Sequence, residues 1–128
     1  MTTVSDLMIR DPAKLDPEAK LEEAWRIMHD QRLRHVPICK GDRLVGLVTQ
    51  KDLLISTQSG SVLSLPVAEV MVFNVRTISP ETDLAIAAQT MLDHKISCLP
   101  VVDGDTLIGI ITESDFLSLL VDMLRKQP

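Results

Sequence analysis

The chain carries one sequence pattern twice, at a constant spacing of 63 residues. Residues 46–52, Gly-Leu-Val-Thr-Gln-Lys-Asp, return as residues 109–115, Gly-Ile-Ile-Thr-Glu-Ser-Asp. When residues 4–54 are paired with residues 67–117, 16 of the 51 pairs are identical and no gap is needed. Average composition would give about three or four identities. The pattern therefore indicates an internal duplication and predicts two copies of one structural unit.

Each copy predicts the same order of elements. A short helical turn, at residues 5–8 and 68–71, precedes extended residues near 13–15 and 76–78. Apolar residues at helical spacing then predict a core-facing helix, from Leu21 to Met28 and from Leu84 to Met91. We expect this helix to begin at an N-cap followed by proline, at residues 16–17 and 79–80. Two strands joined by a Gly-containing turn come next, and a second helix closes the unit.

The unit is thus β-α-β-β-α, and the fold class is α/β (α+β). We expect the first repeat over residues 1–56, a small polar linker over 57–65 and the second repeat over 66–128. One unit has an apolar sheet face and too little core to stand alone, so the two repeats are expected to pack about a pseudo-two-fold axis. Ligand sites, if present, would lie in clefts between the repeats.

Composition and charge exclude several classes of function. The net charge of −5 opposes binding to nucleic acid. No apolar run approaches the roughly 20 residues of a membrane span, and the N-terminus has no secretory pattern, so a cytoplasmic protein without membrane insertion is expected. Cys39 and Cys98 occupy different repeat positions in apolar stretches and are expected to be buried, reduced thiols.

The sequence also lacks the common catalytic motifs. It contains no Gly-x-Ser-x-Gly, His-Glu-x-x-His or phosphate loop. We therefore expect no enzyme, no catalytic residue and no catalytic cofactor. His35 and Cys98 are repeat-equivalent, and with His29 or His94 they could approach as metal ligands, but the spacing is not that of a zinc site, and no metal site is expected.

The repeated Thr-x-x-Asp, Thr49 to Asp52 and Thr112 to Asp115, follows a strand and opens a helix. The simplest interpretation is a capping box, in which Thr and Asp satisfy backbone amides at the helix start. A nucleotide-binding role is the alternative. A helix N-terminus and a hydroxyl suit phosphate, and an aspartate can accept bonds from both ribose hydroxyls. Gly46 and Gly109 would leave room for close approach of backbone or ligand.

The duplicated pattern, with Arg34-His35-Val36-Pro37 and Ser97-Cys98-Leu99-Pro100 before the turns, resembles a tandem pair of CBS (cystathionine-β-synthase-type) domains, a Bateman module. The resemblance covers nearly the whole chain. It implies a regulatory module that binds an adenosyl compound, AMP, ADP or ATP, or else S-adenosylmethionine or NAD, in clefts between the repeats. It also implies that ligand binding alters the conformation of a partner, here a separate and unidentified protein.

The resemblance also implies two sets of nucleotide-binding residues. In each set, Asp holds the ribose and Thr touches phosphate, and the other repeat supplies the contacts to adenine. The first set is Leu47, Thr49, Asp52, Val75, Arg76, Lys95, Ile96 and Ser97. The second set is Ile110, Thr112, Asp115, Pro12, Ala13, Leu33, Arg34 and His35. Arg34, His35 and Lys95 are expected to neutralise phosphate. Because Arg34-His35 becomes Ser97-Cys98, the sites are expected to differ.

A second interpretation is a module with the same fold that binds no nucleotide. In that case the module would serve only to dimerise or to dock a partner through its exposed helices. Apolar residues near the C-terminus, at 117, 119, 120, 121 and 124, exceed what one small helix normally exposes. A homodimer is therefore expected under either interpretation, with packing inside the monomer as the alternative use of these residues.

Overall fold

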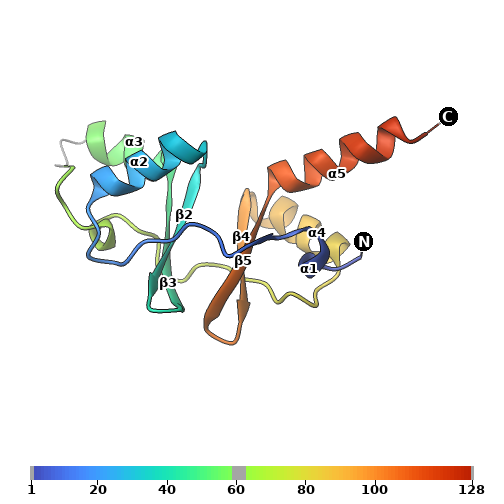
Figure 1. Ribbon diagram of the computed structural model, residues 1–128, viewed down its shortest axis with the longest axis horizontal. Helices are drawn as coiled ribbons and strands as arrows, with labels where there is room; N and C mark the ends of the chain where they lie inside the picture. The colour runs from blue at the N-terminus through green and yellow to red at the C-terminus, as the bar shows by residue number, and fades with distance from the viewer. Residues whose placement is uncertain (1, 59–62, 128) are drawn as a thin grey trace. The chain divides into compact units, whose positions relative to one another are not determined.

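The computed structural model describes residues 2–58 and 63–127, and each repeat contains a short first helix, a long helix, two strands and a closing helix in that order (Figure 1). Strand β1 of the first repeat has no counterpart among the named strands of the second. The elements are α1 (Val4–Leu7), β1 (Ile9–Arg10), α2 (Leu21–Gln31), β2 (His35–Lys40), β3 (Arg43–Thr49), α3 (Gln50–Gln58), the 3-10 helix η1 (Val67–Glu69), α4 (Leu84–His94), β4 (Cys98–Asp103), β5 (Thr106–Thr112) and α5 (Glu113–Arg125). The predicted mixture of helices with antiparallel hairpins is confirmed.

Two compact units make up the chain, and they do not coincide with the two repeats. Unit 1 contains residues 1–11, 76–104 and 108–128, and unit 2 contains residues 12–75 and 105–107. The first eleven residues thus pack with the second repeat, and the segment that opens the second repeat packs with the first. The repeats are successive parts of the sequence, whereas the units are groups of residues that contact one another.

In unit 2, the hairpin of β2 and β3 is antiparallel, from the pair His35 and Thr49 to the pair Lys40 and Arg43, with an irregularity after Ile38. Helices α2 and α3 pack against these strands and against each other (Figure 1). The apolar side of α2 enters the core at the predicted spacing, because this stripe meets the inward side of the hairpin. The core side chains are Leu21, Ala24, Met28, Val36, Ile38, Val48, Leu53 and Val67.

Unit 1 repeats this arrangement with α4, β4, β5 and α5. Strand β5 pairs with β4 and, antiparallel, with β1 from the other end of the sequence, where Ile9 faces Ile110 and Arg10 faces Gly109. The core consists of Val4, Met8, Leu84, Ala87, Met91, Leu99, Val101 and Ile111. Most of these residues lie 63 positions after or before a core residue of unit 2, so the duplication extends to the interior packing.

The predicted starts of the long helices are wrong by four residues. Asp16 does not cap α2; its carboxylate accepts a 2.9 Å hydrogen bond from the Glu18 amide and closes a turn. Helix α2 begins at Leu21 with Lys20 as N-cap, and α4 begins at Leu84 with Asp83 as N-cap. The cause is tertiary, because Lys20 and Asp83 each form an isolated β-bridge, which keeps their backbone extended until the next residue.

Only part of the predicted linker lies among the described residues. Residues 57 and 58 belong to α3, and residues 59–62 lie outside the described range. Residues 63 and 65 are not a loose connection, since their carbonyls accept hydrogen bonds of 3.0 and 2.8 Å from the amides of Glu22 and Leu21. The end of the predicted linker thus forms hydrogen bonds with the first turn of α2.

Candidate functional site

The strand–helix junction of unit 2 holds Thr49 and Asp52 in reciprocal contact. The Thr49 hydroxyl donates to Oδ2 of Asp52 at 2.8 Å, and the Thr49 amide donates to the same oxygen at 3.3 Å. The Asp52 amide donates back to the Thr49 hydroxyl at 3.2 Å. This is the predicted capping box, and it engages only one of the two carboxylate oxygens. Both side chains are half-buried at the start of α3.

The equivalent junction of unit 1 is built in the same way. The Thr112 amide and hydroxyl donate to Oδ2 of Asp115 at 2.8 and 3.1 Å, and the two residues form a capping box at the start of α5. Leu47 and Ile110, two residues before each Thr, are buried. The duplication therefore preserves the local geometry of both candidate half-sites.

A third Thr-x-x-Asp pair, Thr3 and Asp6, lies at the start of α1 and was not part of the predicted site. The amides of Thr2 and Thr3 donate to Oδ2 of Asp6 at 2.9 and 3.0 Å. These amide hydrogen bonds, that from Thr3 above all, lower the pKa of Asp6. This pair is exposed and follows no Gly-containing strand, although its spacing was visible in the sequence. The motif alone is thus a helix cap, and its setting distinguishes the other two copies.

Gly46 and Gly109 allow other segments of the chain to approach closely. A Cβ on Gly46 would stand 2.5 Å from Sδ of Met71 and 3.1 Å from the carbonyl oxygen of Val72. A Cβ on Gly109 would stand 2.7 Å from Sδ of Met8 and 2.9 Å from the carbonyl oxygen of Ile9. Of the two uses considered for these glycines, the structure shows close approach of backbone. The approaching segment in each case precedes a stretch predicted to contact adenine.

Arg34 and His35 lie beside Thr49 within unit 2. The Gln50 amide donates to the Arg34 carbonyl at 2.8 Å, and His35 is the ladder partner of Thr49. Arg34 is exposed, while His35 is half-buried. Burial, together with the positive charge of Arg34, lowers the pKa of His35 to about 4. His35 is therefore neutral at pH 7 and does not bring the positive charge that was expected of it.

The same positions in unit 1 hold Ser97 and Cys98. The Glu113 amide donates to the Ser97 carbonyl at 3.0 Å, as the Gln50 amide does in unit 2. Burial raises the pKa of Cys98 to about 12, and the negative charge of Asp115 acts in the same direction. Cys98 and Cys39 are both free and buried, as expected. The two junctions thus share a backbone plan and differ in the side chain beside the capping box.

The segments predicted to contact adenine are each introduced by a residue with positive φ. Asp11 and Asn74, with φ of 49° and 41°, directly precede Pro12 and Val75. The other two are Arg32, with φ of 54°, just before Leu33, and Lys95, with φ of 53°, which is itself in the predicted set. The four positions form two repeat-equivalent pairs, Asp11 with Asn74 and Arg32 with Lys95. Left-handed backbone is rare outside glycine, so the turns that present these segments are conserved features of the duplication.

The remaining predicted residues divide by exposure. Arg76 and Lys95 are exposed, and six others are half-buried: Pro12, Ala13, Leu33, Val75, Ile96 and Ser97. Each predicted set combines residues of unit 1 with residues of unit 2, so the complete sets stay predictions. Within unit 2, Arg34 and His35 of the second set lie beside the junction of Thr49 and Asp52, which belongs to the first set. Within unit 1, Ser97 of the first set lies beside the junction of Thr112 and Asp115, which belongs to the second.

Among residues 2–58 and 63–127, no three His, Cys, Asp or Glu side chains are grouped so that they could hold a metal ion. Within that same part of the chain, every helix is too short or too polar to cross a bilayer.

Comparison with known proteins identifies the family. The model of the CBS domain matches twice, at residues 4–57 and 67–122. The chain therefore belongs to the CBS-domain family and contains two CBS repeats. It is 31% identical over 116 residues to the CBS domain-containing protein YhcV of Bacillus subtilis. The alignment covers 90% of this chain and 83% of that protein.

A second group of relatives consists of larger enzymes. The chain is 37% identical over 121 residues to homoserine O-acetyltransferase of Methanohalobium evestigatum. This match covers 93% of the chain, which spans only about a quarter (24%) of the length of that enzyme. The shared part is thus the CBS pair.

Solved structures agree with this assignment. A putative acetoin utilization protein (AcuB) from Vibrio cholerae superimposes with a TM-score of 0.92 at 40% identity, covering 96% of this chain and 94% of that one. The CBS domain pair of protein MJ0100, solved with 5′-methylthioadenosine and S-adenosyl-L-methionine, gives 0.87 at 26% identity, covering 96% and 98%. CBSX2, solved with AMP, gives 0.85 at 25% identity, covering 98% and 100%.

Proposed function

We propose that this chain is a regulatory module that binds an adenosyl compound through its two Thr–Asp junctions and signals to a separate protein. AMP, ADP and ATP are the ligands proposed first, with S-adenosylmethionine and NAD as the other adenosyl candidates. The module itself is proposed to be non-catalytic. Support comes from the two structural relatives solved with AMP or with S-adenosyl-L-methionine, which share this fold over nearly their full length.

The observation that carries the proposal is the presence of two equivalent, half-buried capping boxes. Each engages one carboxylate oxygen of its aspartate, Asp52 or Asp115, so the other oxygen is available to the ribose hydroxyls without loss of the cap. The first-turn amides of α3 and α5 contribute a positive potential that favours phosphate. Stability and binding are therefore compatible at the same residues.

Charge is proposed to distinguish the two sites. Arg34, Arg76 and Lys95 are exposed cations that a phosphate could recruit, whereas His35 is neutral at pH 7 and can only exchange a hydrogen bond. Cys98, at the position of His35, stays a neutral thiol. The first set, with Arg76 and Lys95, is thus proposed to favour more highly phosphorylated ligands than the second set, in which Arg34 is the only cation.

Regulation requires that the ligand bind one conformation more tightly than another. The chain has two such conformations if the arrangement of its two compact units changes when an adenosyl compound binds. A partner that contacts both units would then respond to the ligand, and by thermodynamic reciprocity the partner would change ligand affinity by the same factor.

Thermal melts against AMP, ADP, ATP, S-adenosylmethionine and NAD test the proposal. A ligand at about 100 times its Kd should stabilise the folded chain by roughly 2.7 kcal/mol. Asp52→Ala or Asp115→Ala should reduce this ligand-dependent shift. Asp6→Ala provides the matched control, because it removes a Thr–Asp cap of the same spacing outside either predicted site. A wild-type melt unmoved by all five compounds at millimolar concentration would exclude the adenosyl ligands.

A second function, dimerisation or docking without a ligand, is favoured by the exposed apolar residues of α5. It predicts normal folding and association with no response to any adenosyl compound. The two functions share one fold, and the melts above separate them.

A further inference from the structure

Residues 42–44 and 105–107, at the turns of the two hairpins, form a short antiparallel ladder that we call the tip ladder. Its central pair, Arg43 and Thr106, is repeat-equivalent, since the two residues are 63 positions apart. Two hydrogen bonds flank this pair: the Leu44 amide donates to the Asp105 carbonyl at 3.0 Å, and the Leu107 amide donates to the Asp42 carbonyl at 2.9 Å. Each bond is the repeat-equivalent of the other, so the ladder is symmetric under the duplication.

Strands β3 and β5 both lead from the tip ladder to a Thr–Asp junction. Strand β3 ends at Thr49 and β5 ends at Thr112, so each strand spans about 20 Å from the ladder to its junction. Strand β3 is paired with β2 along its length, and β5 is paired with β4 and β1. A strand held by its neighbours moves as one piece, so a shift at the ladder reaches the junction.

Strand β5 also passes from one compact unit to the other. Residues 105–107 belong to unit 2, whereas residues 108–112 belong to unit 1. The beginnings of β3 and β5 are thus joined within unit 2, while their ends lie at junctions that belong to different units. A change in the arrangement of the units must therefore be accommodated at the tip ladder or directly beside it.

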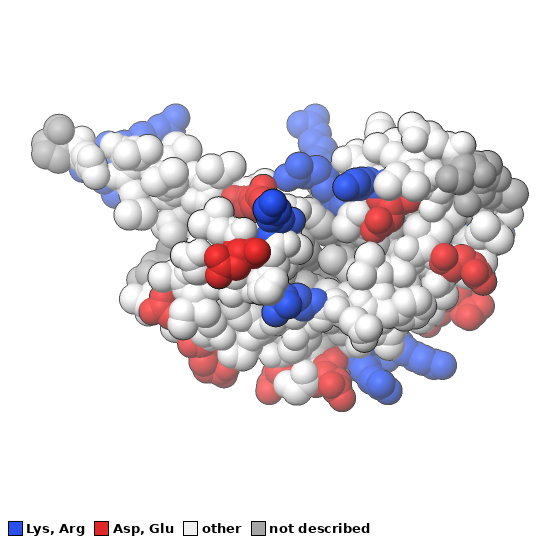
Figure 2. All heavy atoms as spheres, turned by 180° about the vertical axis from the view of Figure 1, so that it is seen from behind, with Lys and Arg blue, Asp and Glu red and all other residues white. Residues whose placement is uncertain are grey.

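The tip ladder is held mainly by backbone hydrogen bonds that lie at the surface. Of its six residues only Leu107 is buried, and four are exposed. Figure 2 shows acidic and basic side chains next to one another along its lower edge, the side on which the turn between β2 and β3 lies in Figure 1. The ion pair of Lys14 Nζ with Asp42 Oδ1, at 3.3 Å, adds little because the Asp42 side chain is 81% exposed. Such a contact opens more easily than a core, so both units can stay folded when it does.

We propose that the tip ladder couples the two Thr–Asp junctions. The ladder is closed in one state of the chain and open in the other, and β3 and β5 carry this difference to Thr49 and Thr112. The coupling itself requires no ligand. Its consequence for binding rests on the proposed function: an adenosyl compound held at one junction would change the affinity of the other, and the effect would be reciprocal.

Amide hydrogen exchange of the full chain tests the coupling without ligand. The amides of Leu44 and Leu107 report on the two hydrogen bonds of the ladder. Asp52→Ala and Asp115→Ala each remove one cap, and each should speed the exchange of both ladder amides by at least about threefold, including the amide on the other strand. Asp6→Ala is the matched control, because it removes a cap of the same spacing that ends neither β3 nor β5. It should leave both rates unchanged.

A disulfide across the central pair prevents the ladder from opening. Arg43 and Thr106 lie between the two hydrogen bonds, and the Cα atoms of such a pair are about 4.5 Å apart, which suits a disulfide. Arg43→Cys combined with Thr106→Cys should therefore cross-link within one chain under mild oxidation. Arg43→Cys alone controls for disulfides with the native cysteines, which are buried.

The cross-linked chain then shows whether the ladder transmits a response to AMP. In an Asp52→Ala background, AMP is left with the junction of Asp115. The reporter is the Leu47 amide, which lies on β3 and donates to the Val72 carbonyl at 3.1 Å. In the reduced form AMP should change the exchange rate of this amide by at least about threefold. In the oxidised form the change should disappear, because the ladder stays closed.

Each result supports or overturns the coupling. Cap variants that leave the ladder amides unchanged, or an equal effect of Asp6→Ala, overturn the proposal. A double cysteine variant that stays reduced, or an oxidised form that still passes the AMP response to Leu47, does so as well. Circular dichroism shows whether the double variant is folded, and if it is not, the exchange rates of the cap variants decide. A wild type unmoved by AMP and the other adenosyl compounds contradicts the ligand function, while the ladder amides still decide the coupling.

Discussion

The Thr49 hydroxyl donates to Asp52 at 2.8 Å while the Asp52 amide donates back to that hydroxyl at 3.2 Å. Replacing Thr49 by valine keeps the shape of the side chain and removes both hydrogen bonds. We expect Thr49→Val to lower the free energy of unfolding by about 1 kcal/mol, the usual cost of a lost N-cap. Urea denaturation measures this loss. Thr49→Ser retains the hydroxyl and should stay close to the wild type; equal stability of the two variants would contradict the role of the cap.

Alanine at Gly109 should be more destabilising than alanine at Gly46. The nearest backbone atom to a new Cβ is the Ile9 carbonyl oxygen at 2.9 Å for Gly109, and the Val72 carbonyl oxygen at 3.1 Å for Gly46. At both positions the closest atom is the Sδ of a methionine, Met71 or Met8, whose flexible side chain can move, so the backbone contact decides the difference. We expect losses of about 3 and about 1 kcal/mol in urea denaturation. The reverse order would show that β1 yields more easily than the Met71 segment.

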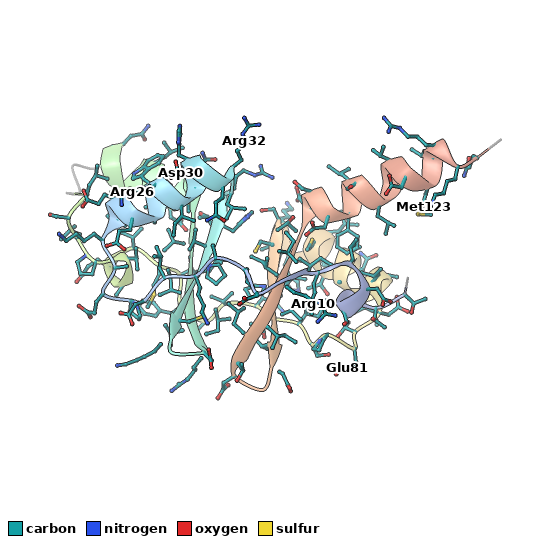
Figure 3. All side chains as sticks on the ribbon, viewed as in Figure 1. Arg10, Arg26, Asp30, Arg32, Glu81 and Met123 are labelled. Atoms are coloured by element: carbon teal, nitrogen blue, oxygen red, sulfur yellow. The ribbon has the colours of Figure 1, made fainter. Side chains whose placement is uncertain are left out.

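Glycine at position 32 should stabilise the protein. Arg32 ends α2 in the left-handed conformation, with φ of 54°, and its side chain extends away from unit 2 (Figure 3). Glycine adopts this conformation without steric cost, so Arg32→Gly should raise the free energy of unfolding by about 1 kcal/mol. Lys126→Gly is the control, since Lys126 ends α5 with φ of −85° and should gain nothing. A gain at both positions would indicate another cause.

Stability should fall between pH 6.5 and pH 4 because of His35. Its pKa is lowered from 6.5 to about 4 by burial first and by Arg34 second, so the folded state resists protonation that the unfolded state accepts. Stability is complete above pH 6.5 and is lost as the pH falls toward 4, by about 3 kcal/mol. Unfolding of wild type and His35→Gln should be compared at several pH values, because carboxylates contribute to both. A difference between the two that does not vary with pH would contradict the prediction.

Local patterns predicted the helices and hairpins because one face of each element enters the core. Leu21 and Leu84 stand at the predicted places in their stripes and are buried. The starts of these helices could not be read in the same way. Asp16-Pro17 suits a turn as well as a helix start, and the bridges of Lys20 to Pro66 and of Thr3 to Asp83 that decide between them join distant residues.

The exchange of opening segments was also beyond prediction. Val4 and Val67 are equivalent residues and both are fully buried, so their sequence gives no indication of which repeat each one contacts. For the site, the spacing identified the capping boxes of Thr49 and Thr112. It could not reveal that His35 is neutral, since burial depends on the tertiary packing around the ring.

The division between units and repeats has a consequence for how fragments should be prepared. A fragment cut at the repeat boundary, residues 66–128, would lack residues 1–11, and with them Val4, Met8 and the strand that covers the edge of β5. A fragment of residues 12–75 keeps nearly all of its own unit in one continuous piece. During synthesis, residues 12–75 can collapse as soon as they are made, while residues 1–11 must wait for β5. Residues 1–11 are thus made before the rest of unit 1 and are among the last of its residues to pack.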